Sequence, residues 1–258
     1  MLALSVMVAG AAPPDLVARA RQFYNQREYD EAIVVARLAG RRPADAAAAA
    51  LVLARSHLER HRSDGNPEDL SAARVALAGI DVSRLVAGDR PELVVGWGEL
   101  FFLEGQSGVA AEMFETALAY SAPPSPVARD RILDWWAQSI DRLARDASAA
   151  TQAQLYDRIL QYMDQERQRA PASAVVAYWI AAAARGTGDI DRAWNAAVSG
   201  WIRANLATGA DTTLRADLDR LVTTAIIPER ARQASPVADY RQAMADLLAE
   251  WESIKKAW

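Results

Sequence analysis

Helix-length segments separated by turn signals run through almost the whole of this 258-residue chain. Glycine, proline or polar breaks fall at residues 26–28, 40–43, 63–67, 105–108 and 186–188, among others. Between the breaks, apolar residues recur with the 3.6-residue period of amphipathic helices, and no alternating β-branched run competes with that pattern. Alanine, the best helix former, supplies much of the 52% hydrophobic content. The sequence therefore predicts an all-α chain of about twelve helices.

Small residues recur at one position of these segments. They are Ala20, Ala54, Gly98, Ala137 and Ala181, separated by 34, 44, 39 and 44 residues. In three units a second small residue lies 12 residues later, and these are Ala32, Ala110 and Ala193. In the second unit Ala73 is the expected partner, because an insertion at residues 63–69 lengthens the turn; the fourth unit has no recognisable second helix. Two antiparallel helices approach closely only where neither carries a large side chain, so the spacing predicts helix hairpins.

Three stretches share the pattern of a helix, a short polar turn and the start of a second helix. They are YNQREYDEAIVVARLAGRRP at 24–43, WGELFFLEGQSGVAAEMFETALAYSAPP at 97–124 and WIAAAARGTGDIDRAW at 179–194. Together with the spacing of small residues, they resemble the tetratricopeptide repeat family. The resemblance implies a right-handed superhelical α-solenoid of about five to six hairpins, each burying its apolar face against its neighbours. We expect the array to span residues 13–205 and residues 206–258 to form C-terminal helices that cap it.

In that family the first helix of each hairpin lines a concave groove that takes an extended peptide or a partner helix. The resemblance therefore implies a non-catalytic scaffold that binds a protein or peptide. The groove positions predicted to contact the partner are Arg21, Tyr24, Asn25, Arg55, Glu99, Phe102, Asp134, Asp141, Tyr178 and Arg185. Gln138 and Arg142 occupy further groove positions in the fourth unit. Their mixture of arginine, aromatic and acidic groups suits a polar peptide.

The eight tryptophans raise an alternative function. A carbohydrate-binding or carbohydrate-active helical protein would use surface tryptophans, with a carboxylate pair such as Asp130 and Asp134 as acid and base. That function requires several indole rings exposed along one groove, whereas a scaffold buries them between hairpins. Trp97 and Trp136 occupy the large apolar position of the repeat, and the two aspartates stand among arginines, which is typical of a solvated face. The scaffold is therefore preferred.

The composition argues against a metal site, a bound cofactor and a nucleic-acid partner. The chain has no cysteine, and its only histidines, His57 and His61, are four residues apart on one predicted helix. A zincin helix carries glutamate directly after the first histidine, whereas Glu59 lies two residues after it, and a metal site normally needs three protein ligands. We expect His57 to be a packing residue and no cofactor to be bound. A net charge of −4 and a pI near 5.4 argue against a nucleic-acid partner.

The N-terminus predicts export. Residues 2–9 are apolar, and Ala9-Gly10-Ala11 fits a signal-peptidase site, although the run is short and no basic residue precedes it. Residues 1–12 are therefore predicted to be a truncated signal peptide of a periplasmic or secreted bacterial protein, and a cytoplasmic adaptor of the same fold is the alternative. No stretch reaches the roughly 18 apolar residues that span a bilayer, so no transmembrane segment is expected.

Overall fold

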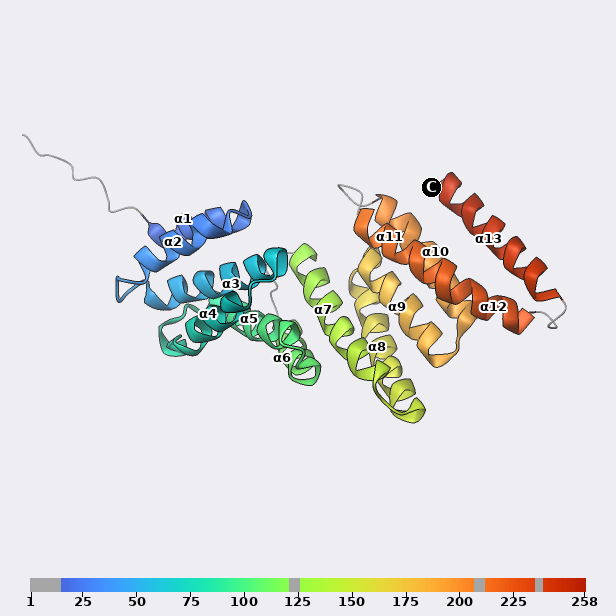
Figure 1. The fold of residues 1–258 in the computed structure, drawn as a ribbon, viewed down its shortest axis with the longest axis horizontal. Helices are drawn as coiled ribbons and strands as arrows, with labels where there is room; N and C mark the ends of the chain where they lie inside the picture. Colours follow the sequence, from blue (N-terminus) through green and yellow to red (C-terminus); the bar gives the residue numbers. More distant parts are fainter. Residues whose placement is uncertain (1–14, 121–125, 207–211, 235–238) are drawn as a thin grey trace, which may run out of the picture. The chain divides into compact units, whose positions relative to one another are not determined.

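The computed structural model describes residues 15–120, 126–206, 212–234 and 239–258, and within these ranges every regular element is helical (Figure 1). The prediction of an all-α chain is therefore confirmed. The predicted signal peptide at residues 1–12 lies outside the described residues. In the ranges that the structure covers, no helix is both long and apolar enough to cross a membrane.

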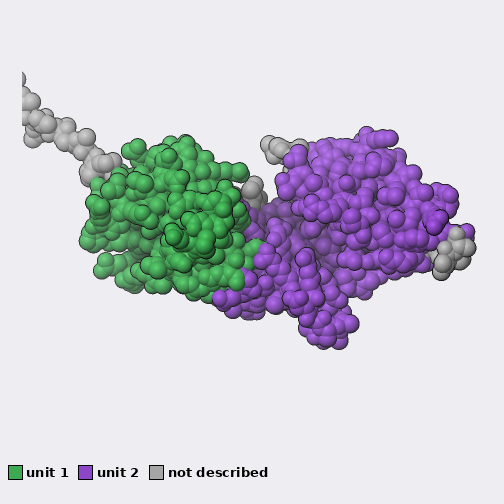
Figure 2. All heavy atoms as spheres, in the orientation of Figure 1, with its two compact units in different colours: residues 1–104 green, residues 105–258 purple. Residues whose placement is uncertain are grey.

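The chain divides into two compact units, residues 1–104 and 105–258 (Figure 2). The helices of the first unit are α1 (Leu16–Asn25), α2 (Tyr29–Ala39), α3 (Ala46–Asp64), α4 (Pro67–Ala78) and α5 (Arg90–Leu103). The helices of the second unit are α6 (Ser107–Ala119), α7 (Pro126–Arg145), α8 (Ala149–Arg169), α9 (Ala174–Thr187), α10 (Ile190–Leu206), α11 (Thr212–Leu221), α12 (Ile227–Ala234) and α13 (Tyr240–Ala257). A π-helical segment, Val222–Ile226, joins α11 to α12.

Local sequence signals fix several helix ends. The Asn66 side chain accepts a hydrogen bond from the Glu68 amide and precedes Pro67, a residue favoured in the first turn because its missing N–H is not needed there. Ser173 caps α9 by accepting from the Val176 amide. Gly188 ends α9 with a φ of 85°, a left-handed conformation that favours glycine. The turn between α9 and α10 is therefore encoded in the sequence.

Packing within each unit follows chain order. Consecutive helices pack on one another, and alternate helices also touch, as α1 with α3 and α3 with α5 in the first unit and α7 with α9 and α9 with α11 in the second. The predicted small residues lie where close packing requires them. Ala20, Ala32, Ala54, Ala73, Ala181 and Ala193 are all 0% exposed. Helix hairpins that lie side by side therefore build each unit.

The fourth of the predicted repeats has a second helix that the small-residue pattern did not reveal. It is α8, which packs on α7 and α9 through large side chains, including the fully buried Ile159 and Met163. Glu166, 2% exposed, binds Arg129 of α7 through two hydrogen bonds of 2.8 and 2.6 Å. Because α7 runs for 20 residues, the 12-residue spacing of the other hairpins does not apply here.

Most indole rings are core residues. Six of the eight tryptophans are at most 7% exposed, and these are Trp135, Trp136, Trp179, Trp194, Trp201 and Trp251. Trp251 holds α13 in place: its ring lies edge-on to Trp194 and Trp201 of α10, and its Nε1 donates to Asp219 of α11 at 2.8 Å. The exposed rings that a carbohydrate function would need are therefore missing at these six positions.

His57 is a buried packing residue, 2% exposed, rather than one of a pair of exposed ligands. Its Nδ1 lies 2.5 Å from Asp69 of α4, whose other contacts are the Nε and one terminal nitrogen of Arg60 at 2.9 and 2.6 Å. Burial lowers the pKa of His57, so it is neutral at pH 7, and the hydrogen bond from Arg60 lowers the pKa of Asp69. Among the described residues, no three acidic or histidine side chains gather as a metal site would need.

The small residues at helix contacts can be tested with one pair of variants. Ala181→Leu adds three carbons at a fully buried position of α9 and is expected to lower the free energy of unfolding by about 1–3 kcal/mol, because overpacking forces helices apart. Ala182→Leu, at the partly exposed next position, is expected to change it by less than about 0.5 kcal/mol. Urea unfolding followed by circular dichroism measures both. Equal losses in the two variants would contradict close packing at Ala181.

His57 links stability to mildly acidic pH. Because its folded pKa is below the ordinary value of about 6.5, the unfolded chain binds a proton that the folded chain rejects. The contribution of neutral His57 to the free energy of unfolding is fully present above pH 6.5. It is lost as the pH drops toward the folded pKa of His57, by at most about 1.4 kcal/mol per pH unit. The loss from Asp69 comes at lower pH, below about 3.9, where the unfolded carboxyl becomes protonated.

Urea unfolding between pH 7.5 and 5 tests this linkage. His57→Asn keeps an amide near the position of Nδ1 but cannot titrate, so the decline in stability over this range is expected to flatten. A decline as steep as that of the unaltered protein would show that His57 is not its source.

Candidate functional site

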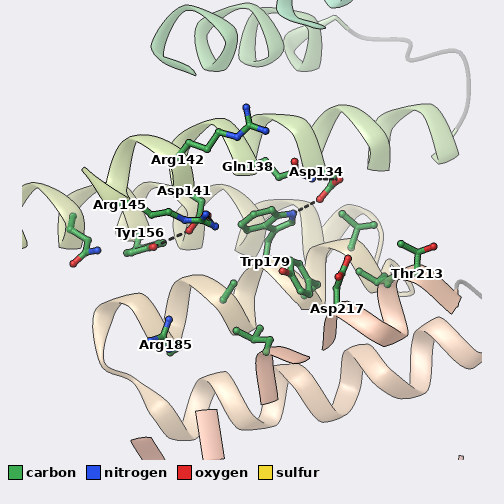
Figure 3. Close-up of a pocket in the computed structure, with 16 residues that line it drawn as sticks. Asp134, Gln138, Asp141, Arg142, Arg145, Tyr156, Trp179, Arg185, Thr213 and Asp217 are labelled. Carbon is green, nitrogen blue, oxygen red and sulfur yellow. Dashed lines mark hydrogen bonds and ion pairs between the residues drawn. The ribbon is translucent and has the colours of Figure 1, made fainter. Parts of the chain in front are cut away.

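A groove of about 740 Å³ crosses the second unit (Figure 3). Its walls come from α7, α9 and α11, with α8 contributing at one side. This volume lies within the range of roughly 300–1,000 Å³ that ligand sites occupy. The groove is therefore large enough to hold several residues of an extended chain.

The structure brings four predicted partner-binding residues together in this groove. Asp134 and Asp141 of α7 line it with Tyr178 and Arg185 of α9, and the further groove positions Gln138 and Arg142 lie among them. The spacing explains this, because residues four, seven and eight apart fall on one face of a helix. Because α7 and α9 pack against each other, the residues on these two faces line the same groove.

One end of the groove is acidic and aromatic. Asp134 accepts hydrogen bonds from Trp179 Nε1 at 2.8 Å and from Gln138 Nε2 at 2.7 Å. Tyr178 packs edge-on against Trp179, with ring centroids 5.2 Å apart. Burial, and then the negative charges of Asp217 and Asp134, raise the pKa of Tyr178 to about 12. Within the described parts of the chain, the Tyr178 hydroxyl makes no hydrogen bond, so it is available to a ligand.

The other end carries three arginines. Asp141 accepts a hydrogen bond from the Tyr156 hydroxyl at 2.9 Å and another from Arg145 at 2.5 Å. Burial, and then the charge of Asp141, raise the pKa of Tyr156 to about 12. Arg185 donates through two nitrogens to Glu229 of α12, at 3.0 and 2.6 Å. Burial and then the neighbouring Arg145 lower the pKa of Arg142, yet an arginine remains cationic at neutral pH.

A glycine shapes the wall beside Tyr156. A Cβ added at Gly186 of α9 would lie only 2.3–2.6 Å from three carbons of the Tyr156 ring. The absence of a side chain at residue 186 therefore lets the ring lie flat on α9 and point its hydroxyl at Asp141. The stretch 186–188 thus supplies both this contact and the turn after α9.

The predicted residues of the first unit form a separate and smaller hollow. Arg21, Tyr24 and Asn25 of α1 and Arg55 of α3 line a space of about 120 Å³. Arg21 binds Asp89 at 2.7 Å, and Arg55 binds Glu92 at 3.0 Å with its guanidinium carbon 4.8 Å from the Tyr24 ring centroid. This hollow has room for about four waters.

Glu99 and Phe102 of α5 are buried, 0% and 7% exposed. They offer almost no side-chain surface, unlike the residues of the groove in the second unit.

No model of a protein family matches the chain, and searches of curated proteins and of solved structures give no match either. The functional inference therefore depends on the geometry of the two units.

Sequence patterns missed part of the groove. Thr213, Leu214 and Asp217 of α11 line it, although residues 206–258 were expected only to cap the array, and Tyr156 of α8 belonged to the unrecognised helix. The periodicity of α11 was visible, but nothing in the sequence paired that helix with α9. Asp130, the expected partner of Asp134 in a glycosidase, is not a lining residue, and both its oxygens accept from the Ser173 hydroxyl at 3.1 Å.

Gly186→Ala tests how the wall of the groove is built. Because the new methyl group would overlap the Tyr156 ring, we expect a loss of about 1–3 kcal/mol in the free energy of unfolding, despite the better helix propensity of alanine. Gly108→Ala in α6 is the control, since a Cβ there meets no atom within 4 Å, and it is expected to be neutral or stabilising by up to about 1 kcal/mol. Similar changes from both substitutions would mean that Tyr156 does not depend on Gly186.

Proposed function

We propose that this protein is a non-catalytic scaffold that binds a peptide segment of a partner protein in the groove between α7, α9 and α11. The observation that carries the proposal is the convergence of Asp134, Asp141, Tyr178 and Arg185 on one hollow of about 740 Å³. The repeat pattern of the sequence independently predicts these four residues to face a partner from the first helices of their hairpins.

The helix packing supports the same proposal. Alternate helices touch in each unit, as they do where hairpins stack and their first helices line one surface. We propose that the units are tetratricopeptide-like arrays of right-handed superhelical form. The groove between first helices is then the surface on which an extended segment lies.

The lining favours a polar peptide over a sugar. Sugar sites stack rings on exposed indoles, whereas Trp179, the tryptophan of the groove, is 4% exposed and its Nε1 is already bonded to Asp134. The charged groups and the tyrosine hydroxyl suit backbone amides and charged side chains. Export through residues 1–12, with a periplasmic or secreted location, remains part of the proposal and rests on the apolar run and the Ala-Gly-Ala site.

The experiment is a peptide selection followed by a groove-filling variant. Random twelve-residue peptides displayed on phage are selected on the full-length protein, and the affinity of a selected peptide is measured by fluorescence anisotropy. Ala182 lines the groove, so Ala182→Tyr is expected to weaken binding about tenfold or more, equivalent to ~1.4 kcal/mol.

Ala150→Tyr is the matched control, because Ala150 is exposed on α8 and does not line the groove. It is expected to leave the affinity unchanged. No selected peptide, or selected peptides that bind both variants equally well, would contradict binding in this groove. Selection of a polysaccharide but of no peptide, in a parallel panel, would instead support the carbohydrate alternative.

A further inference from the structure

A second hollow of the second unit, about 350 Å³ in volume, is lined by residues of α8, α9 and α10. It shares no lining residue with the groove between α7, α9 and α11, so it is a separate site. Its volume lies within the range of roughly 300–1,000 Å³ that small-ligand sites occupy. Arg192, Ala196, Ser199 and Arg203 of α10 line it at spacings of three or four residues, which places them on one face of that helix. We call this hollow the basic pocket.

Part of the wall of the basic pocket is apolar. Ala177 and Ile180 of α9 line it and are 1% and 3% exposed, and Ala196 of α10 lines it beside them. The two helices approach closely next to the pocket, because a Cβ added at Gly200 would lie 3.3 Å from the Cβ of Ala177. An apolar group of a ligand can therefore pack against this wall and leave water.

Three arginines from two helices line the rest of the pocket. Arg167 of α8 contacts Asp164 at 3.3 Å, and Arg192 binds the same carboxyl group at 2.7 and 2.6 Å. Arg203 donates to the neutral Ser199 hydroxyl at 3.3 Å, and no carboxyl group among the described residues forms an ion pair with it. None of the described residues that line the pocket is acidic. One carboxyl group therefore serves three guanidinium groups, each of which is cationic at neutral pH.

We propose that the basic pocket binds a small organic anion, in which an apolar body carries a carboxylate or a phosphate group. The apolar body packs against Ala177, Ile180 and Ala196, and the anionic group is bound by Arg203 with Arg167. A guanidinium group binds either oxyanion through two parallel hydrogen bonds. Apolar walls with a few well-placed polar groups are typical of small-molecule sites. This site is additional to the peptide groove of the proposed function.

Four small probes separate the two parts of the ligand. Hexanoate and hexyl phosphate carry both the apolar chain and an anion, hexanamide carries the chain alone, and acetate carries an anion alone. Dissociation constants come from NMR titrations of the full-length protein at constant neutral pH and ionic strength. At least one of the two hexyl anions is expected to bind about three- to tenfold more tightly than hexanamide and than acetate.

Two pairs of variants locate the binding. Arg203→Gln is expected to weaken the tighter hexyl anion about three- to tenfold and to leave hexanamide unchanged. Arg241→Gln is its control, because it makes the same charge change at an exposed site of α13 outside the pocket lining. Ala196→Phe fills the pocket and is expected to weaken the anion about tenfold or more. Ala150→Phe, at an exposed site of α8 outside the lining, is expected to have no effect.

Circular dichroism checks that each variant is folded. Arg167→Gln repeats the charge test at a side chain that is 53% exposed, where a substitution does not threaten the fold. Equal affinity for the hexyl anions and hexanamide, or equal effects of Arg203→Gln and Arg241→Gln, would overturn the anion site. Anion binding that Ala196→Phe leaves intact would also overturn it.

The proposed function is tested separately from this site. Because the two hollows share no lining residue, Ala196→Phe is expected to keep the full affinity for a phage-selected peptide that binds in the groove. The effect of Ala182→Tyr on that peptide therefore decides peptide binding in the groove, and the hexyl anions decide the basic pocket.

Discussion

Close approach of helices at fully buried alanines is the constraint on which the rest of this structure depends. Ala20 and Ala32, and Ala181 and Ala193, have no exposed surface and lie on helix pairs that pack together. Helices that meet through small residues pack at short interaxial distances, so each hairpin is thin and its neighbour can lie directly beside it. Alternate helices then touch, and in the second unit this brings α7, α9 and α11 around a shared hollow.

The groove that results is held by polar contacts as well as by packing. A buried indole N–H needs an acceptor, and Trp179 finds it in Asp134, which fixes both groups at the wall between α7 and α9. The Tyr156 hydroxyl likewise donates a hydrogen bond to Asp141, and the Tyr156 ring can take this position because Gly186 leaves room for it. These bonds orient carboxylates toward a hollow that a partner can enter. The same side chains thus stabilise the second unit and set the charge pattern of its groove.

Sequence periodicity was sufficient to predict much of this arrangement. The helical class, the buried small residues and the groove faces of α7 and α9 all follow from repeats of three to four residues within a helix. Glu99 and Phe102 have the same register but are buried, because register alone does not say how much of a helix face its surroundings cover. The sequence patterns also missed α8 and α11. The packing of α8 uses large residues such as Met163 in place of the small-residue contact, and Asp217 reaches the groove through contacts between distant parts of the chain.

The carboxyl groups of the groove are held in place by hydrogen bonds from neighbouring side chains. A glycosidase needs one carboxyl group kept protonated near neutral pH beside the scissile bond, and it achieves this by raising that group's pKa. In the groove, Asp141 accepts hydrogen bonds from Tyr156 and Arg145, and Asp134 accepts one from Trp179. Burial does raise the pKa of Asp130, but that carboxyl is bonded to Ser173 and does not line the groove. Carboxyl groups held in fixed positions beside guanidinium groups are the features on which the proposed recognition of a polar peptide rests.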